Sequence, residues 1–587
     1  MVKLPQFMSV PTECRICSGP LVLRFRGAES AAESQHLSPT NHRPGEHGDL
    51  FVCRHCGTVH QPSLPEGADL HDLYRGVEDE AYLDEETGRR ATARRLLDLI
   101  GRNVPAGRLL DVGCGHGLLL DEARRRGYDV VGLELSASSA AYGREVLGLD
   151  VREQALDEFS DDEGFAVVVL ADVIEHLDDP VAAIDHCQGL LAPGGVLCVV
   201  TPDPSSRTAR LAGRRWWGYL PAHTYLLPRT TLRELLSARG LIISEDVPLV
   251  RSFALRYWVG GLAERSGGSA ARAVGWLRRS RFGRATVSMS LGDERVVLAH
   301  RVEPIAPPEP RVTDRGGDQK VHIVLPAYNA TRTIPLVAAA IPVQAADRAL
   351  LVDDASPDET STVALREGFH VLRHPANRGY GANQKTCYTR AAIDGADIVV
   401  MVHADNQYDP ALVADMVRPI EEGFADVVIG SRLLEDETIA GGMPRWKWIG
   451  NRLLTGLENR GFRRRFSEYH TGYRAFSVDF LRSIPFHRNS DGFVFDQEIF
   501  AQMVARDARV VELAIPTRYF LEASSVSFIT SVNYGLRTLS VLARYRLDER
   551  RQNWPLLRPP AARLSEPKAD LVAQPSHEDS ERGEDRQ

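Results

Sequence analysis

Two runs of alternating strand and helix patterns, divided by a proline-rich segment, constrain the fold of this chain most. The first run covers residues 107–302 and the second begins at residue 321 and continues to about residue 550. Between them, residues 304–310 read Pro-Ile-Ala-Pro-Pro-Glu-Pro, a composition that favours a stiff linker. Strands that alternate with helices predict parallel sheets covered by helices. Since 587 residues are too many for one hydrophobic core, we expect two doubly wound α/β domains.

The segments outside these two runs have a different character. Residues 1–62 contain paired cysteines, residues 63–106 have a helical pattern, and the residues after 550 are rich in Glu, Asp, Arg, Ser and Pro. Such a polar tail is typical of disorder. We therefore predict a cysteine segment at 1–62, a helical connector at 63–106, α/β domains at 107–302 and 320–550, a linker at 303–319 and a disordered tail at 551–587.

The four paired cysteines indicate a metal site. Cys14 and Cys17 form one C-x-x-C motif, and Cys53 and Cys56 form a second. Four thiolates suit a tetrahedral Zn²⁺ ion, and a site closed by four cysteines is structural and not catalytic. We expect a small zinc ribbon here. Four nearby histidines could replace a cysteine as ligands: His36, His42, His47 and His55. The simpler interpretation is that they are solvated loop residues.

Overall charge and the remaining cysteines narrow the class of protein. The chain has 70 Lys and Arg against 79 Asp and Glu, a formal net charge of −9, whereas general nucleic-acid-binding proteins are normally basic. We find no signal-peptide pattern and no run of about 18 apolar residues that would span a membrane. The other four of the eight cysteines are scattered, which suits a reducing compartment. We expect a cytoplasmic protein.

A glycine-rich loop follows the first strand of the first α/β run. Residues 109–117 read Leu-Leu-Asp-Val-Gly-Cys-Gly-His-Gly, so Gly113, Gly115 and Gly117 can bring the backbone close to a ligand. The next strand ends in Glu134, and an acidic residue there can accept both hydroxyls of a ribose. These features alone suit a nicotinamide dinucleotide as well as S-adenosylmethionine.

Three further features separate the two cofactors. The glycine spacing is G-x-G-x-G with Asp111 before it, residues 171–177 read Ala-Asp-Val-Ile-Glu-His-Leu after the fourth strand, and residues 191–195 end in Pro-Gly-Gly. Residues 107–245 thereby resemble class I S-adenosylmethionine-dependent methyltransferases. The resemblance implies that Asp172 lies at the mouth of the site. It also implies that the cofactor's methionyl part, ribose and adenine lie among six other residues: Asp111, Gly113, Gly115, Gly117, Glu134 and Asp157.

The methyl acceptor requires its own groups. Methyl transfer is an in-line displacement, in which the enzyme mainly positions the acceptor and excludes water. A hydroxyl or acidic C–H acceptor also needs a base, for which we predict His176 and His223, with capping or core roles as the alternative. The cysteine segment followed by this domain is similar to zinc-containing sugar C-methyltransferases and to ribosomal-RNA guanine methyltransferases. Acidic residues after the cysteines favour a sugar or small-molecule acceptor over RNA.

The second α/β run places polar residues at the ends of three strands. Residues 321–329 end in Pro-Ala-Tyr-Asn, the next strand leads into Asp353 and Asp354, and a third leads into residues 403–410. Carboxylates at the C-terminal ends of such strands can hold a base and ribose. Side-chain oxygens in the third segment are suitable ligands for a hard cation that bridges a diphosphate.

The order of these motifs over residues 320–525 resembles family 2 glycosyltransferases of the GT-A fold, specifically polyprenyl- or dolichyl-phosphate mannose synthases. The resemblance implies a nucleotide sugar held by five residues: Pro326, Tyr328, Asp353, Asp354 and Arg432. It implies Mg²⁺ or Mn²⁺ at Asp405 and Gln407. Two departures are evident, since His403 replaces the first aspartate of the usual D-x-D and Ala330 replaces an acidic residue.

The glycosyl acceptor side has three candidate acid–base groups, Asp496, Glu498 and Glu468, although a phosphate acceptor would need no base. Aromatic and basic residues at 446–449 and 463–465 could contact an anionic membrane at its inner face, or could simply form a surface helix.

The sequence as a whole predicts a bifunctional transferase that uses S-adenosylmethionine, structural zinc and Mg²⁺ or Mn²⁺. Its expected partners are a nucleotide-sugar donor and a sugar, glycan or polyprenyl-phosphate acceptor, with no nucleic acid. The alternatives are a methyltransferase joined to a non-catalytic nucleotide-sugar-binding scaffold and a ribosomal-RNA methyltransferase.

Overall fold

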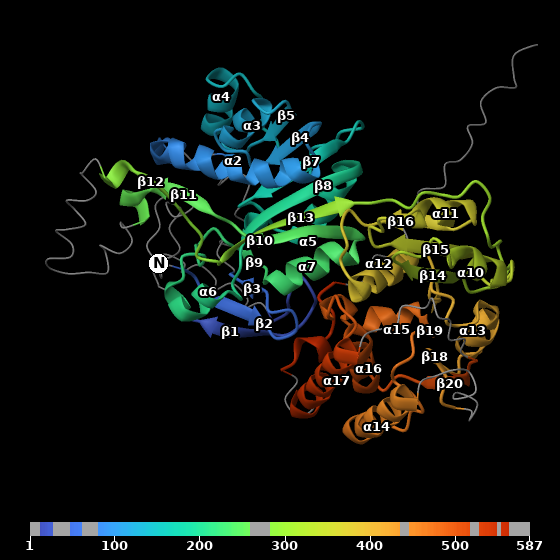
Figure 1. Cartoon of the computed structure of the whole chain (residues 1–587). Coiled ribbons are helices and arrows are strands. Elements are labelled where there is room, and N and C mark those ends of the chain that lie inside the picture. The colour runs from blue at the N-terminus through green and yellow to red at the C-terminus, as the bar shows by residue number, and fades with distance from the viewer. Residues whose placement is uncertain are drawn as a thin grey trace, which may run out of the picture.

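The computed structural model describes residues 12–27, 47–61, 75, 80–258, 282–434, 445–516, 528–548 and 553–562. Within these residues, two seven-stranded sheets dominate the molecule, one in each predicted α/β region (Figure 1). Both sheets are built largely from parallel strands connected through helices. This confirms the prediction of two doubly wound α/β domains.

The first domain is built on a sheet of strand order β10-β13-β8-β7-β4-β5-β6. Only β13 is antiparallel to its neighbours. The strand order reverses beside β4, between β7 and β5, and a ligand crevice forms at such a reversal beyond the C-terminal strand ends. The strands are β4 (Arg108–Val112), β5 (Asp129–Leu133), β6 (Asp150–Arg152), β7 (Phe165–Ala171), β8 (Leu191–Pro202), β10 (Leu241–Pro248) and β13 (Glu294–Arg301).

Helices cover both faces of this sheet (Figure 1). Apolar residues of the strands are therefore buried on either side, as the near-continuous burial of β7 shows. One face packs against α2 (Glu86–Asn103), α3 (Leu118–Arg124) and α4 (Ala137–Glu145). The other packs against α5 (Pro180–Leu190) and α7 (Arg229–Ala238).

The second domain has the strand order β16-β15-β14-β17-β19-β18-β20. Strand β19 is antiparallel to both neighbours, so β14, β15, β17 and β18 all end at the same edge of the sheet. The strands are β14 (Val321–Ala327), β15 (Arg348–Asp353), β16 (His370–Arg373), β17 (Ile398–Met401), β18 (Val427–Ser431), β19 (Arg474–Ser477) and β20 (Val510–Ala514).

Helices again form the outer layers of this domain. On one face lie α10 (Ile334–Ala340), α11 (Thr360–Arg366) and α13 (Val413–Glu421). On the other lie α12 (Tyr380–Ile393), α15 (Val478–Ser483) and α16 (Phe495–Ala505). Two further helices, α14 (Arg445–Phe462) and α17 (Phe528–Asp548), pack against each other at the lower edge in Figure 1.

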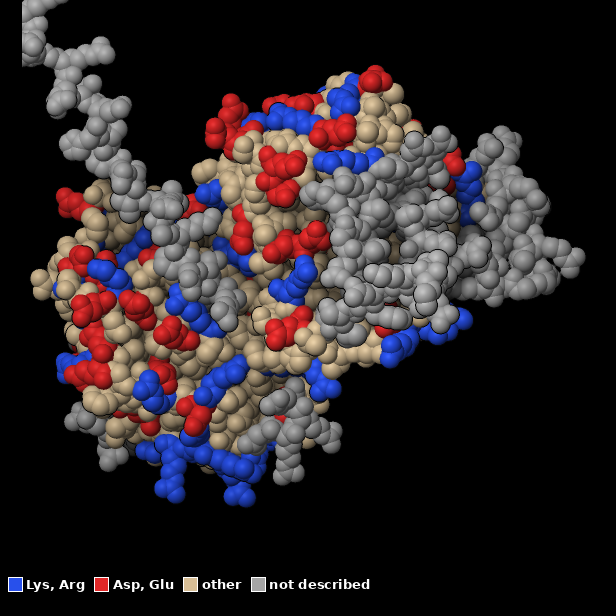
Figure 2. Space-filling view, turned by 180° about the vertical axis from the view of Figure 1, so that it is seen from behind, with Lys and Arg blue, Asp and Glu red and all other residues tan. Residues whose placement is uncertain are grey.

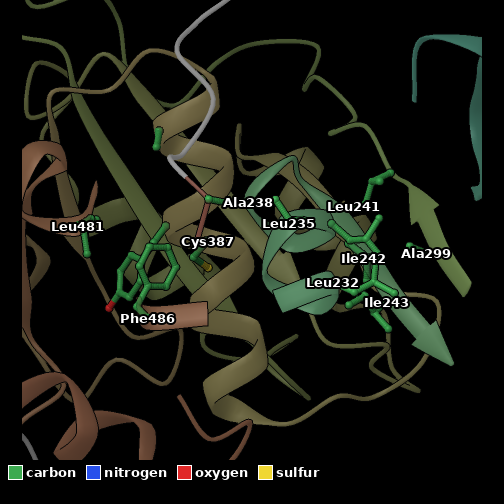
Figure 3. Close-up of a cluster of buried hydrophobic side chains, with 14 of the residues drawn as sticks. Leu232, Leu235, Ala238, Leu241, Ile242, Ile243, Ala299, Cys387, Leu481 and Phe486 are labelled. Atoms are coloured by element: carbon green, nitrogen blue, oxygen red, sulfur yellow. The ribbon is translucent and has the colours of Figure 1, made fainter. Parts of the chain in front are cut away.

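A continuous apolar cluster joins the two domains (Figure 3). Helix α7 and strand β10 of the first domain contribute Leu235 and Ile242, and the second domain contributes Cys387 and Phe486. A buried ion pair between Arg488 and a residue of α7 lies at the same interface. The domains are therefore packed together and not simply tethered.

The cysteine segment forms a small sheet with the first domain. Strands β1 (Leu21–Phe25), β2 (Leu50–Cys53) and β3 (Val59–His60) are antiparallel, and β3 pairs with β9 (Tyr225–Leu226) of the first domain. A separate ribbon joins β11 (Arg251–Ala254) to β12 (Thr286–Met289).

One prediction about the connecting segments needs correction. The predicted linker lies against the second domain, because Ile305 bridges to Val371 on the edge strand β16. Residues 553–562, expected in a disordered tail, are packed, because Leu556 and Ala561 are buried and the amide of Ala561 donates to Glu234 (2.7 Å). The rest of the predicted tail lies outside the described residues.

Candidate functional site

The glycine-rich loop of the first domain needs glycine at each predicted position. Gly113, Gly115 and Gly117 have φ of 67°, 54° and 79°, a region that side chains disfavour. A Cβ on Gly113 would lie 2.7 Å from the side chain of Val173. The loop therefore stays open and close to the end of β7, where a ligand in the crevice would lie.

Glu134 meets this loop as the sequence predicts. Its carboxylate accepts hydrogen bonds from the amides of Gly115 and Ser136, each at 2.7 Å. Asp111 lies beneath, only 3% exposed, and burial together with the charge of Glu134 raises the pKa of its carboxyl to about 8. Asp157 lies at the surface after β6. The ends of β4 and β5 thus bring two carboxyl groups to one crevice.

An aromatic residue that the sequence did not single out lies against this loop. The ring of Tyr82 stacks on His116 of the glycine loop with centroids 5.0 Å apart, and the Arg89 guanidinium lies 3.7 Å from the Tyr82 centroid. The Tyr82 hydroxyl would lie 3.8 Å from a Cβ on Gly115. Residue 82 lies in the segment predicted only as a helical connector, where nothing but the aromatic residue itself marks it.

A second group of ionisable residues lies at the end of β7. Asp172 has φ of +58°, rare for a residue with a side chain, and its carboxylate pairs with Arg251 at 2.6 Å. Arg251 also pairs with Glu294 from β13. Glu175 is buried, accepts the Thr201 hydroxyl at 3.0 Å through one oxygen, and has no hydrogen-bond partner at the other.

The two predicted bases come together beside Glu175. The rings of His176 and His223 are 4.7 Å apart and nearly perpendicular. The Nδ1 atom of His176 donates to the Ala222 carbonyl (2.9 Å), and that of His223 to the Gly218 carbonyl (2.8 Å). In the neutral rings, each Nε2 is therefore the unprotonated nitrogen.

The four predicted zinc ligands also converge. The Sγ atoms of Cys14, Cys17, Cys53 and Cys56 lie within 4.8 Å of one another, with the closest pairs 3.4 and 3.6 Å apart. Tetrahedral Zn²⁺ with Zn–S bonds of about 2.3 Å would place its sulfurs about 3.8 Å apart, so the site fits this ion. The arrangement supports a closed structural site.

The histidines near these cysteines have other contacts. His47 is buried and bonds the Arg214 carbonyl through Nε2 (3.1 Å), so it is not the solvated loop residue expected. His55 is half-buried, and neither of these belongs to the four-cysteine group. His36 and His42 lie outside the described residues. His60, which the sequence did not single out, places Nε2 3.1 Å from the Cys14 sulfur.

In the second domain, the paired aspartates are buried and support their loops. Asp354 accepts hydrogen bonds from His374 Nδ1 (2.7 Å) and from the amides of Arg378 and Gly379 (2.8 Å each). Asp353 accepts from the Ser356 amide at 2.9 Å. The neighbouring Tyr328 is 52% exposed and Pro326 is half-buried, so these two remain accessible to a ligand at the strand edge.

The predicted cation ligands lie in the turn after β17. Asp405 accepts from the Gln407 amide at 3.1 Å, and both side chains are partly exposed. His403, which is also half-buried, contacts the Tyr380 hydroxyl through Nε2 at 3.2 Å, and burial lowers its pKa. Asp405 is therefore the carboxylate that this turn offers to a cation.

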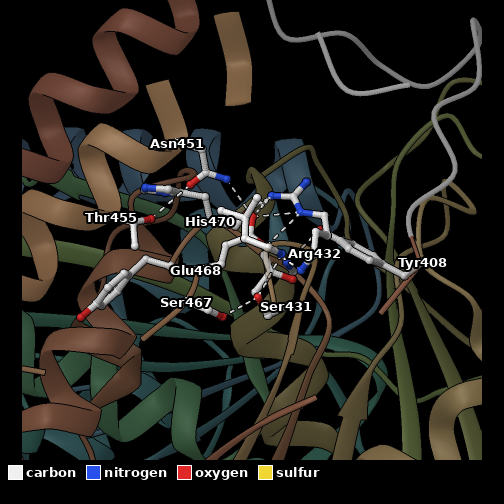
Figure 4. A network of polar contacts seen from close by, with 12 residues as sticks. Tyr408, Ser431, Arg432, Asn451, Thr455, Ser467, Glu468 and His470 are labelled. Carbon is white, nitrogen blue, oxygen red and sulfur yellow. Dashed lines mark hydrogen bonds and ion pairs between the residues drawn. The ribbon is translucent and has the colours of Figure 1, made fainter. Parts of the chain in front are cut away.

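Arg432 lies in a polar network at the end of β18 (Figure 4). Its guanidinium and its backbone amide both contact Glu468, which is fully buried and also accepts from Asn451 of α14 at 2.9 Å. The Arg432 charge holds the pKa of Glu468 below its usual range against the opposing effect of burial. Glu468 is thus a structural partner of Arg432.

The other two acid–base candidates also have protein partners. Asp496 pairs with Arg474 at 2.9 Å and accepts from Gln384 at 3.1 Å. Glu498 accepts from the Ser490 amide, and burial raises its pKa. Asp496 lies nearer to the strand edge, because the Tyr380 hydroxyl that contacts His403 also contacts it (3.4 Å).

Comparisons with known proteins agree with both halves of the molecule. Residues 85–245 match the model of a methyltransferase domain, and residues 322–484 match that of glycosyl transferase family 2. An uncharacterized protein of Methanocaldococcus jannaschii is 29% identical over 232 residues, which cover 39% of this chain and 93% of that protein. The ubiquinone biosynthesis O-methyltransferase of Rhodopseudomonas palustris is 31% identical over 158 residues, or 24% of this chain and 61% of that enzyme.

Solved structures with some likeness include one for each half. The match with glucosyl-3-phosphoglycerate synthase of Mycobacterium tuberculosis, solved with uridine diphosphate, covers 40% of this chain and 82% of that chain, at 19% identity and a TM-score of 0.32. The N-methyltransferase NodS of Bradyrhizobium japonicum with S-adenosylhomocysteine covers 40% and 97%, at 18% identity and a TM-score of 0.27. From the family matches, the chain combines a methyltransferase domain with a family 2 glycosyltransferase domain.

Proposed function

We propose that this protein is a bifunctional enzyme that methylates a sugar or small-molecule acceptor with S-adenosylmethionine and transfers a glycosyl group from a nucleotide sugar. The observation that carries the proposal is the meeting of predicted ligand residues at two separate strand edges. Glu134 contacts the loop of Gly115 at one edge. At the other, the strands that lead into Asp354 and Asp405 flank β14 on either side.

In the methyltransferase domain, the crevice residues fit the cofactor. Burial and the charge of Glu134 raise the pKa of the Asp111 carboxyl, so the positive methionyl part of S-adenosylmethionine would favour its ionised form. We assign Glu134 to the ribose and Asp157 to the adenine side, with Tyr82 beside the loop. Bound S-adenosylmethionine supplies an activated methyl group, which the protein must align with the acceptor.

The acceptor side of this domain combines positioning with proton handling. Asp172 at the crevice mouth is fixed by Arg251, and its other oxygen has no hydrogen-bond partner. We assign the acceptor's proton to His176 and His223, as the bases of this site. The three side chains would present an acceptor oxygen or carbon to the cofactor's methyl group.

In the glycosyltransferase domain, the donor would lie along the strand edge. Tyr328 and Pro326 can contact the nucleotide, while the buried Asp353 and Asp354 hold the loops that shape its site. Asp405, with Gln407, is the ligand we propose for Mg²⁺ or Mn²⁺, which neutralises diphosphate charge when bound. Arg432 faces the same edge, and Asp496 is the proposed base if the acceptor is a hydroxyl.

The acceptor of this domain can be a polyprenyl phosphate or glycan at a membrane surface. Helix α14 exposes Ile449, Leu453 and Leu457 on one side, at a spacing of four residues, next to exposed arginines such as Arg452 and Arg460. Figure 2 shows basic side chains gathered at the lower edge of the molecule, where Figure 1 places α14. Among the described helices, none is long and apolar enough to cross a bilayer. Peripheral contact is therefore the mode we propose.

Calorimetric titration tests both halves with one preparation. We expect wild-type protein to bind S-adenosylmethionine and, in the presence of Mn²⁺, at least one nucleoside diphosphate. Glu134→Gln should weaken the first by about tenfold or more while sparing the second, because a neutral amide is a weaker acceptor for ribose hydroxyls. Asp405→Ala should show the converse, and it should abolish glycosyl transfer from a nucleotide sugar. Unaltered binding in either variant would contradict that half of the proposal.

One observation favours a second candidate. His403 stands where the first aspartate of the metal motif is usual and is held by Tyr380, which leaves Asp405 with less help in holding a cation. The domain would then bind a nucleotide sugar without transferring it. Nucleotide binding that is independent of Mn²⁺, with no product formed from any nucleotide sugar, would favour this scaffold function.

A further inference from the structure

The acceptor side of the methyltransferase domain contains a second group of potential metal ligands, separate from the four cysteines. One ligand atom each of Glu175, His176 and His223 lies within 4.8 Å of the other two. Glu175 and His223 are 1% and 5% exposed, and His176 is half-buried. We propose that these three side chains bind a divalent transition-metal ion.

The two imidazoles are oriented as metal ligands usually are. A histidine that binds a metal through one nitrogen commonly donates its other N–H to a carbonyl or carboxylate, which fixes the tautomer and the ring orientation. His176 and His223 both donate from Nδ1 to a backbone carbonyl, those of Ala222 and Gly218. The two rings lie 4.7 Å apart and nearly perpendicular, so each can turn a ring nitrogen toward one shared ion.

Glu175 adds the carboxylate and is itself unusually placed. One of its oxygens accepts from Thr201 and the other is buried without a hydrogen-bond partner, a costly arrangement unless something else satisfies it. A cation would satisfy this oxygen and also favour the ionised carboxylate. Asp172, three residues earlier, has an unpartnered oxygen of its own and would add negative charge nearby.

The donor set limits the ion. Two imidazole nitrogens and one carboxylate oxygen suit Zn²⁺, Mn²⁺ or Fe²⁺ better than Mg²⁺ or Ca²⁺, which prefer oxygen ligands. Bonds of about 2.0–2.2 Å require donor atoms no more than about 4.4 Å apart, so small side-chain rotations close the site. Three protein ligands leave coordination positions open, in contrast to the cysteine site.

The open positions would allow the ion to bind the methyl acceptor. This role in methylation rests on the proposed function, whereas the metal site itself does not. An oxygen of the methyl acceptor could bind there, and coordination to a divalent cation lowers the pKa of a bound hydroxyl, so its proton would pass to water; the oxygen then takes the methyl group and S-adenosylhomocysteine leaves. The expected acceptor is then one with a hydroxyl group, and methylation should depend on the divalent ion.

Titration of the full chain with Mn²⁺, followed by electron paramagnetic resonance, tests the site. An Asp405→Ala background removes the proposed cation ligand of the other domain, and the cysteine site keeps its zinc. We expect Mn²⁺ to bind in this background and to be weakened at least about tenfold by Glu175→Gln or His223→Ala. The matched control is His186→Ala, which removes a half-buried histidine of the same domain that bonds only the Phe159 carbonyl in the described structure and should leave Mn²⁺ affinity unchanged.

Binding of S-adenosylmethionine, measured on the same samples, shows that each variant is folded and separates the two proposals. Mn²⁺ binding that is unaffected by Glu175→Gln and His223→Ala would overturn the metal site. Absence of Mn²⁺ and Zn²⁺ binding at these residues in protein that binds S-adenosylmethionine would also overturn it and leave the histidines as free bases. Mn²⁺ binding without any methyl transfer would uphold the site and remove the proposed function.

Discussion

Neutralising Glu234 should destabilise the interface between the two domains by an amount that the structure allows us to estimate. Glu234 on α7 is 1% exposed and its carboxylate lies 2.6 Å from Nε of Arg488, which is 5% exposed. Arg488 also donates to the Pro555 carbonyl at 2.8 Å. Burial raises the pKa of Glu234, and the Arg488 charge opposes this rise only in part. The 2.6 Å contact makes these two side chains a buried ion pair inside a largely apolar interface.

The Glu234→Gln substitution keeps the shape and the acceptor for the Ala561 amide but leaves Arg488 without a counter-charge. Breaking a buried pair in this way typically costs about 3–5 kcal/mol. For a cooperative unit of 150–250 residues, about 3 kcal/mol corresponds to a fall in Tm of roughly 6–12 °C. We expect this shift in scanning calorimetry of the full chain, in the transition that includes domain separation.

Two further variants give the reasoning its controls. Asp415→Asn removes an ion pair with Arg418 of similar length, 2.7 Å, whose side chains are 43% and 61% exposed. It should cost no more than about 1 kcal/mol. The double variant Glu234→Leu with Arg488→Met should recover most of the loss, because apolar replacement of both partners is often neutral. Equal shifts for Glu234→Gln and Asp415→Asn would refute the argument from burial.

Four other outcomes are expected. Affinity for S-adenosylmethionine should rise with pH up to about 8 and then level off, because Asp111 with its raised pKa must lose a proton to attract the cationic cofactor. Calorimetric titration at several pH values measures this, and the affinity of Asp111→Asn should not change with pH. The same raised pKa means that the folded state binds the extra proton, so this group's ionisation costs stability as pH rises from about 4 to 8. Elemental analysis should find zinc in wild-type protein and lose one equivalent in the Cys14→Ser, Cys17→Ser variant. Gln61→Ala should lower methyl transfer while sparing cofactor affinity, because the Gln61 side-chain amide joins the zinc segment to the Leu220 carbonyl (2.6 Å) close to His223, whereas its contact with the Thr224 carbonyl is made by the backbone and remains. Equal loss of both would indicate general unfolding.

Sequence reasoning succeeded where chemistry and backbone are local. The glycine loop follows from residue types whose φ values only glycine adopts easily, and Glu134 follows from its place at the end of the next strand. The alternation of strands and helices is enough to predict both sheets, because βαβ units have one favoured geometry. The family matches at residues 85–245 and 322–484 agree with these predictions.

Sequence reasoning was insufficient where a residue's role depends on what surrounds it. Asp353 and Asp354 look alike as ligands, but the structure turns them inward onto amides and His374. His47 was expected in solvent and is buried instead, because its ring bonds a carbonyl 167 residues away. Tyr82 offered no pattern, since stacking on His116 depends on how the connector lies across the domain.

The amino-acid sequence by itself determined the two α/β domains, the four-cysteine site and the strand ends at which ligands would bind. These are encoded in spacing and in the conformational limits of single residues, so they need no knowledge of neighbours. Only the tertiary structure decided that residues 553–562 pack against both domains, that the domains share one apolar core, and that Glu175, His176 and His223 meet. Such contacts depend on burial and on pairings between distant segments, which arise when the whole chain packs and not from any local pattern.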